Sequence, residues 1–461
     1  MSVVDQVAQW ADERFEATVE ELCGYLRIPA ISCEPAHHGD VARLAAQIRA
    51  ELAALGFTAH VRELPGALPL VAAERRCTRE DAPTVLVYGH LDLQPVRGEA
   101  WSTPPHEPTR KGERLYARGA ADDMGGWVSH VACFRAWLAV AGELPVHVKL
   151  VIEGEEEIGS PNLERFMDAF PGDFEADVMV LTDCENPSTE IPGLTTSLRG
   201  LYEVELTCEA LSSDVHSGLW GNMAPDVGNA LMSLLARLVD EDGRMRLGRR
   251  EVPESWRRAA EAIPLTPEVI RSGAHLLDGV DPLPLRGRPA AEWLWRQPAV
   301  TVLSTTLPRP DEHKNALRSR ASATLSIRVP PGMTHDEMRA QLEAELLVDP
   351  PGGVRVTLVE RPGRADSWLY TPEGPAFEAA DRAYERAWGR PLVQIGIGGS
   401  IPFVASFGRR YAHLPLLLNG VMDPETGAHG PDESLHLGVF RKAILANVYL
   451  LDELSRLPAQ G

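Results

Sequence analysis

One run of apolar residues, ending in a histidine and an aspartate, limits what this chain can fold into more than any other stretch. Residues 85–88 read Val-Leu-Val-Tyr, and residues 89–92 read Gly-His-Leu-Asp. Four such residues in a row predict a strand buried on both faces, as in a parallel sheet. His90 and Asp92 would then lie at its carboxyl end, the edge of an α/β sheet where ligands bind.

In extended chain, Asp92 lies on the same side as His90. Its carboxylate is therefore expected to hold one ring nitrogen of His90 and to leave the other free for a metal ion. The alternative is an ordinary strand end followed by two polar loop residues. The choice depends on whether further metal-ligating residues occur downstream.

Strand and helix patterns alternate through the first part of the chain and return near its end. The strand patterns cover residues 57–64, 84–88, 146–152, 178–181, 392–397 and 414–418. The helical patterns cover residues 3–26, 41–55, 127–140, 161–170, 376–388 and 437–457. This order predicts an α/β domain, made of residues 1–193 and 362–461, with a mixed, largely parallel sheet between helices.

The pattern between these two parts is different. Residues 201–208 and 323–329 alternate apolar and polar side chains, which is typical of a sheet with one solvated face. Helices are expected over residues 227–238 and 336–347, and a further strand over 354–359. These elements predict an inserted α+β domain over residues 194–361. The segment 249–298, rich in proline and arginine, receives no function from the sequence.

Composition excludes several classes of function. A length of 461 residues indicates about two or three domains, and a net charge of −21 argues against nucleic-acid binding and against an anionic membrane surface. No run reaches the roughly 20 apolar residues of a membrane span. The six cysteines are scattered without a Cys-x-x-Cys pair, and no signal peptide is visible, so a cytoplasmic protein with reduced, mostly buried thiols is expected.

Residues of metal-ligating types recur where predicted strands end or in loops. They are His90, Asp122, Glu156, Glu157, Asp183 and His429. Carboxylates and imidazoles without cysteine suit Zn²⁺, Mn²⁺ or Co²⁺ rather than Ca²⁺. The four carboxylates have no lysine or arginine beside them in sequence, so one divalent ion would leave them under-compensated and two would balance them. The sequence therefore favours a dinuclear site with one bridging carboxylate.

Eight motifs follow one another along the chain. They are Gly-His-Leu-Asp at 89–92, Ala-Arg-Gly-Ala-Ala-Asp-Asp-Met-Gly at 117–125, Glu-Gly-Glu-Glu-Glu-Ile-Gly-Ser at 153–160, Thr-Asp at 182–183, Asp-Val-His-Ser-Gly at 214–218, Ser-Ile-Arg at 326–328, Gly-Gly-Ser-Ile-Pro at 398–402 and Ala-His at 428–429. In this order they resemble the M20 family of metallopeptidases, in particular its carnosinase-like or cytosolic nonspecific dipeptidase branch.

The resemblance implies a role for each candidate residue. Asp122 would bridge two zinc ions, with His90 and Asp183 on one ion and Glu157 and His429 on the other. Glu156 would be the general base that takes a proton from the attacking water, and Asp92 would orient His90. The family also implies a cis peptide bond between Asp122 and Asp123.

The resemblance places the substrate-binding residues mainly in the inserted domain, which would serve as a lid and dimerisation domain. His216 would stabilise the oxyanion in the active site of a dimer partner, although a helix cap is the alternative for this histidine. Arg328 and Asn315 would hold the carboxylate of a small peptide or N-substituted amino acid. Ser400 and Gly399, in the catalytic domain, would assist them.

One position departs from the family pattern. Related enzymes often carry glutamate before the Gly-Gly-Ser motif, where it meets the substrate ammonium, whereas this chain has Ile397. Either Glu425 or Asp423 supplies that charge, or the substrate carries an N-acyl or N-carbamoyl group. A dipeptidase, an amidohydrolase of the same family and a catalytically silent metal-binding protein therefore remain as alternatives. Glu156 argues against the last of these, because a structural metal site needs no general base.

Overall fold

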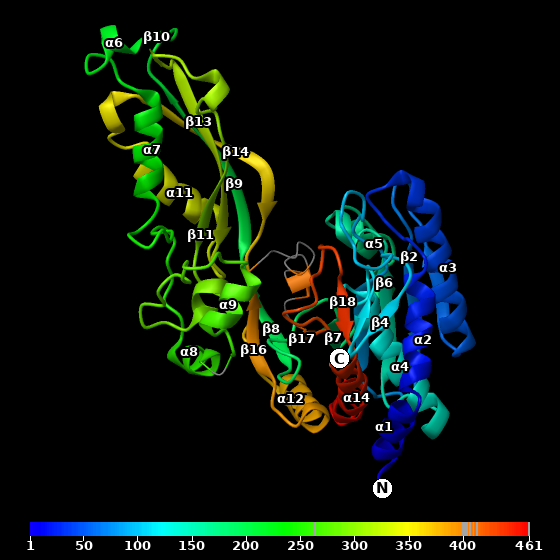
Figure 1. Ribbon diagram of the computed structural model, residues 1–461. Helices are drawn as coiled ribbons and strands as arrows, with labels where there is room; N and C mark the ends of the chain where they lie inside the picture. The colour runs from blue at the N-terminus through cyan, green and yellow to red at the C-terminus, as the bar shows by residue number, and fades with distance from the viewer. Residues whose placement is uncertain (262, 399–403, 405–406, 409, 412–413, 460–461) are drawn as a thin grey trace. The chain divides into compact units, whose positions relative to one another are not determined.

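The computed structural model describes residues 1–261, 263–398, 404, 407–408, 410–411 and 414–459. It divides into two compact units (Figure 1). Unit 1 consists of Met1–Thr196, Thr371–Ile395 and Ser406–Gly461, and unit 2 consists of Ser197–Tyr370 and Gly396–Ala405. Two of the boundaries between the units fall within strands, β8 (Gly193–Leu198) and β16 (Val393–Ile397).

Unit 1 is built on a six-stranded sheet. Its strand order is β1 (Thr58–Arg62), β2 (Leu70–Arg75), β6 (His147–Glu153), β3 (Thr84–His90), β7 (Val178–Leu181) and β17 (Leu416–Leu418). The last four of these strands run parallel to one another, and β2 runs antiparallel to both of its neighbours, β6 and β1. The mixed, largely parallel sheet expected from the buried-strand patterns is therefore confirmed. Strand β2 was not predicted.

Among the residues that the structure describes, seven α-helices of unit 1 accompany this sheet. They are α1 (Val3–Glu13), α2 (Phe15–Leu26), α3 (His38–Ala54), α4 (Met124–Ala141), α5 (Leu163–Ala169), α12 (Pro375–Trp388) and α14 (Leu437–Leu454). Helix α4 packs against β3 and against α1, α2 and α14, which explains why it is buried along most of its length.

The single helix predicted over residues 3–26 is wrong in one respect, because the chain breaks at Arg14. The backbone of Arg14 has φ −100° and ψ 7° and separates α1 from α2. Phe15 then packs against Phe440 of α14, with ring centroids 5.9 Å apart. Apolar spacing alone does not reveal this break, because both helices bury the same kind of stripe.

Unit 2 contains a four-stranded antiparallel sheet with the order β11 (Ala299–Thr305), β13 (Arg320–Val329), β9 (Gly200–Glu209) and β14 (Arg355–Ala365). Helices α7 (Val227–Arg237) and α11 (His335–Leu346) share one apolar core with this sheet, which confirms the predicted α+β arrangement. The proline- and arginine-rich segment forms three short helices, α8 (Glu254–Ala260), α9 (Pro267–Gly273) and α10 (Ala290–Trp295).

Two further features bear on the class of protein. Among the described residues, no helix combines the length and the apolar character that crossing a membrane requires. All six cysteines are free, and four of them are buried, which agrees with the expectation of mostly buried thiols.

Candidate metal centre

The metal-ligating side chains of unit 1 gather at the carboxyl ends of neighbouring parallel strands. His90 is the last residue of β3, Glu156 and Glu157 lie in the 3₁₀ turn η2 (Glu156–Ile158) after β6, and Asp183 follows β7. Because β3 pairs with both β6 and β7, these strand ends lie next to one another. Asp122 precedes helix α4, and His429 comes from the loop before strand β18 (Ser434–His436).

The first group of candidate ligands, the inner triad, consists of His90, Asp122 and Asp183. His90 Nε2 lies 3.1 Å from Asp122 Oδ1 and 3.9 Å from Asp183 Oδ2. The three side chains are only 0%, 6% and 11% exposed, respectively. The inner triad is thus a buried imidazole between two carboxylates.

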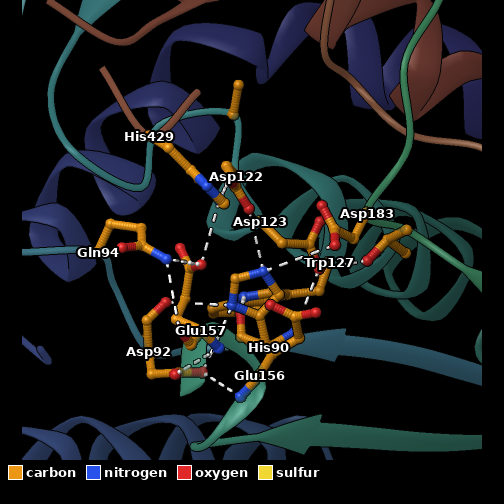
Figure 2. Close-up of polar contacts among 12 residues, drawn as sticks. His90, Asp92, Gln94, Asp122, Asp123, Trp127, Glu156, Glu157, Asp183 and His429 are labelled. Atoms are coloured by element: carbon orange, nitrogen blue, oxygen red, sulfur yellow. Dashed lines mark hydrogen bonds and ion pairs between the residues drawn. The ribbon is translucent and has the colours of Figure 1, made fainter. Parts of the chain in front are cut away.

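The second group, the outer triad, consists of Asp122, Glu157 and His429. His429 Nε2 lies 3.0 Å from Asp122 Oδ2 and 3.2 Å from Glu157 Oε2. Asp122 therefore presents one oxygen to each histidine, so that a single carboxylate belongs to both triads (Figure 2). This is the arrangement that a bridging ligand requires.

Asp92 contacts the ring of His90, as expected, and makes further contacts that were not predicted. His90 Nδ1 lies 3.1 Å from the main-chain oxygen of Asp92 and 3.5 Å from the carboxylate oxygen Oδ1. The shorter contact makes the main-chain carbonyl the principal partner of this ring nitrogen, which leaves Nε2 facing the triad. The carboxylate of Asp92 also accepts the backbone N–H groups of Glu156, at 3.1 Å, and Glu157, at 3.0 Å. Asp92 thus connects the end of β3 to the turn that bears both glutamates.

Other buried side chains fix the loop of Asp122. Glu433 accepts the backbone N–H groups of Ala121 and Asp122 at 3.2 and 3.3 Å, and it pairs with Arg118 at 2.9 Å. The peptide bond between Asp122 and Asp123 is cis, as the family resemblance predicts. Asp123 belongs to neither triad.

Sequence reasoning missed several of these supporting residues. The indole of Trp127 donates to the carbonyl of His90 at 3.0 Å, and Gln94 donates to Glu157 at 2.7 Å. Asp123, which the sequence suggested as a supporting residue rather than a metal ligand, accepts the N–H of His90 at 3.2 Å. Glu433 stands in the same loop as His429, but its partners Arg118 and Asp122 lie more than 300 residues earlier. Nothing in the spacing of one sequence indicates such pairs.

The electrostatics of the cluster show an excess of negative charge. Burial raises the pKa of Glu156 and of Asp183 well above the ordinary range, and the neighbouring carboxylate of Asp122 raises both further. Hydrogen bonds with Asp122 and Glu157 raise the pKa of His429 to about 11. Within the described part of the chain, no lysine or arginine forms an ion pair with Asp122, Glu156, Glu157 or Asp183. Two oxygen- and nitrogen-donor triads whose carboxylates pair with no lysine or arginine among the described residues fit divalent metal ions.

The candidate residues of unit 2 lie in two places. His216 ends β10 (Val215–His216), and its Nδ1 accepts the N–H of Gly218 at 3.0 Å, which caps the short helix α6 (Ser217–Trp220). Asn315 lies beside it, since the carbonyl of Asn315 accepts the N–H of Ser217 at 3.0 Å. Arg328 lies apart from them on β13, paired in register with Ala299. Ser400 and Gly399 lie outside the described residues.

Comparison with known proteins identifies one family. A model described as Peptidase family M20/M25/M40 matches residues 86–453. The cysteinylglycine-S-conjugate dipeptidase of Corynebacterium striatum is 33% identical over 358 residues, covering 77% of each chain. The Cys-Gly metallodipeptidase of Schizosaccharomyces pombe is 24% identical over 467 residues, covering 96% of each chain. The crystal structure of human carnosine dipeptidase 1 shares the fold, with a TM-score of 0.77 at 24% identity over 99% of this chain and 100% of that chain.

Proposed function

Because this chain belongs to the M20/M25/M40 family of peptidases, we propose that it hydrolyses the amide bond of dipeptides at a centre of two divalent metal ions. The observation that carries this proposal is Asp122, whose two oxygens face the histidines of the inner and outer triads separately. His90 and Asp183 would complete one ion, and Glu157 and His429 the other. The mixed imidazole and carboxylate donors favour Zn²⁺, with Mn²⁺ or Co²⁺ as the next choices.

The residues of unit 1 divide the chemical work between them. The bound ions would supply Lewis acidity and lower the pKa of a water molecule. Glu156 then takes a proton from the attacking water and gives it to the leaving amine. Burial, together with the neighbouring carboxylates, raises the pKa of Glu156, which suits a group that must both accept and return a proton near neutral pH.

We assign the catalytic role to unit 1 and the lid and dimerisation role to unit 2. Arg328 forms no ion pair with any residue that the structure describes, so it is available for the carboxylate of a substrate. Ser400, Gly399 and Asn315 would assist it. The Nδ1 of His216 is occupied by the helix cap, which leaves Nε2 to face an oxyanion.

A homodimer follows from the same assignment. The residues after His216 carry large apolar side chains that face solvent in the single chain: Leu219, Trp220 and Met223 are 74%, 53% and 81% exposed. Covering them with a second copy would bury this apolar surface. The cytoplasmic location expected from the cysteines stays a prediction.

A second candidate function is hydrolysis of N-acyl or N-carbamoyl amino acids, and the apolar residue Ile397 favours it. An isoleucine cannot pair with the free ammonium of a dipeptide. Of the two acids that might replace it, Asp423 is buried and hydrogen-bonds to both terminal nitrogens of Arg114. Glu425 lies 3.7 Å from the same arginine and is 84% exposed, so it alone remains available to bind an ammonium group.

The decisive experiment compares the wild type with Glu156→Gln on free dipeptides and on their N-acylated forms, with added Zn²⁺ or Mn²⁺. We expect dipeptide hydrolysis by the wild type and a loss of about 10²–10⁴-fold in kcat for the variant, with two ions still bound per chain. Hydrolysis of acylated substrates alone would favour the second candidate. If neither class is hydrolysed, the chain is a silent metal-binding protein and the enzyme proposal fails.

A further inference from the structure

Unit 2 contains a cavity of about 380 Å³, separate from both triads. Its lining comes from helices α9 and α10, the loops around them and the first residues of β11. Most of this lining is aliphatic, with Leu265, Ile270, Leu283 and Leu294 among its members. A volume of a few hundred cubic ångströms with mainly apolar walls is typical of a site for a small molecule.

Several of the lining leucines are only partly covered by the protein itself. Leu283, Leu285 and Leu294 are 51%, 39% and 45% exposed. Large apolar side chains that gather around a concave opening indicate a ligand with an apolar body, because covering them removes that surface from water.

Arg199 brings a positive charge to the wall of this cavity. It is only 9% exposed, and its guanidinium donates to two main-chain carbonyls, those of Gly398 at 3.0 Å and Gln297 at 3.3 Å. No carboxylate among the described residues pairs with it, and no acidic residue lines the cavity. Burial and the nearby Arg328 lower the pKa of Arg199 to about 10, which leaves it charged at neutral pH. A buried guanidinium without an acidic partner is rare in proteins.

The second arginine of the cavity differs in this respect. Arg244 stacks on the ring of Trp293 at 4.2 Å, donates to the carbonyl of Pro284 at 2.6 Å and lies 3.5 Å from Asp242. Its charge is therefore partly balanced by the protein. Arg199 is the cation that an anionic ligand would neutralise.

We propose that this cavity binds an amphipathic monocarboxylate, a molecule with one carboxylate group and an unbranched or aromatic apolar body. The carboxylate pairs with Arg199, and the apolar body lies along Leu265, Ile270, Leu283 and Leu294. This inference goes beyond peptide hydrolysis and does not depend on it, because none of the lining residues belongs to the triads or to the proposed substrate-binding set.

Equilibrium dialysis of the wild type with three probes of equal chain length tests the charge requirement. The probes are octanoate, 1-octanol and octylammonium. We expect octanoate to bind at least tenfold more tightly than 1-octanol, and octylammonium not to bind detectably. Equal binding of octanoate and 1-octanol, or no binding of octanoate, would overturn the proposal.

Matched variants locate the site. Leu294→Asp puts a negative charge on the lining at a half-exposed position that tolerates a polar side chain, so it should weaken octanoate binding at least tenfold. Leu277→Asp, at a 76% exposed position outside the lining, should leave binding unchanged. Equal affinity in these two variants would place the octanoate elsewhere and refute the assignment.

Two arginine variants separate this cavity from the proposed substrate site. Arg199→Gln should weaken octanoate binding at least tenfold and leave 1-octanol binding unchanged, whereas Arg328→Gln should change octanoate binding less than twofold. If Arg328→Gln abolishes octanoate binding, the ligand occupies the proposed substrate-carboxylate site, and the cavity assignment is wrong. Because Leu294→Asp changes no buried hydrogen bond, it tests the cavity assignment even if Arg199→Gln fails to fold.

Discussion

The inner and outer triads share Asp122 but are built on different parts of the fold. His90 and Asp183 stand at the ends of β3 and β7, two strands that hydrogen-bond directly to each other. Glu157 and His429 stand in a short 3₁₀ turn and in a loop. The side chain of His90 is fully buried, whereas that of His429 is 58% exposed.

This contrast indicates how each half of the centre is held in place. The strands β3 and β7 position His90 and Asp183 of the inner triad, so these two residues come together once the sheet has formed. The outer triad depends on contacts that fix its loops, chiefly the hydrogen bonds from the Glu156 and Glu157 backbone to Asp92 and from Gln94 to Glu157. We therefore expect the outer ion to respond to loop changes that leave the inner ion unaffected.

The largest effect should come from Asp122→Ala, which removes the carboxylate that both triads share. We expect metal content to fall from two ions per chain to nearly none, and hydrolysis to become undetectable. Metal analysis by mass spectrometry after gel filtration measures the first effect. Asp81→Ala, at an 89% exposed carboxylate, is the control. Retention of one tightly bound ion in Asp122→Ala would show that the triads do not depend on a common ligand.

The second effect compares the same substitution in the two histidines. His90→Asn and His429→Asn should each remove one ion, but only His90→Asn should also destabilise the metal-free protein, by about 2–5 kcal/mol, because it leaves a cavity in the buried core. His429→Asn should cost about 1 kcal/mol or less, since the site is exposed and asparagine tolerates its φ of 62°. Urea unfolding of both variants in chelator measures the difference. Equal destabilisation would contradict the distinction between the triads.

His90 and Asp183 of the inner triad could be predicted from the sequence because they follow buried strands of the sheet. The same strands hold these two residues in place. A buried strand can be recognised from its own residues, as the prediction of residues 178–181 shows, since β7 has these bounds. Parallel strands end at one edge of a sheet, so residues that follow them, such as His90 and Asp183, are expected to meet. Local pattern and common topology were sufficient for His90 and Asp183, whereas the bridging role of Asp122 came from the family resemblance.

The residues that fix the outer triad contact parts of the chain that are far away in sequence. A single sequence shows no periodic pattern from which such contacts can be predicted. The carboxylate of Asp92 was expected on the His90 ring, where its Oδ1 lies 3.5 Å from Nδ1, but the backbone groups that it accepts more than 60 residues later were not predicted. Gln94 and Glu433 were not singled out, because their partners become neighbours only when the loops are placed. Trp127, which donates to the carbonyl of His90 in the inner triad, was not singled out either. The break at Arg14 was missed for a related reason, since the packing of Phe15 on α14 decides it.

A smaller effect is expected from Asp92→Ala, which removes the acceptor of the Glu156 and Glu157 backbone groups. The turn would lose its attachment to β3, and we expect affinity for the outer ion and kcat to fall about 10–100-fold. The inner ion should stay, because the main-chain carbonyl of Asp92, which contacts His90 Nδ1, survives the substitution. Titration with Zn²⁺, followed by a competing chromophoric chelator, separates the two affinities. Weakening of the inner ion alone would restore the simpler role of Asp92 as a ring orienter.

The smallest effect concerns the rate at which the wild type loses its ions. A chelator should remove the outer ion first, because His429 is exposed and held by a loop, while His90 and Asp183 are nearly closed to water. Timed dialysis against the chelator should then pass through a species with one ion per chain. In Gln94→Ala this species should form faster, since Gln94 donates directly to Glu157, whereas its further decay to the metal-free protein should be unchanged. If both ions leave at the same time, the shared Asp122 carboxylate couples the two metal sites. The separate contacts that fix each triad would then not determine the rate at which its ion is lost.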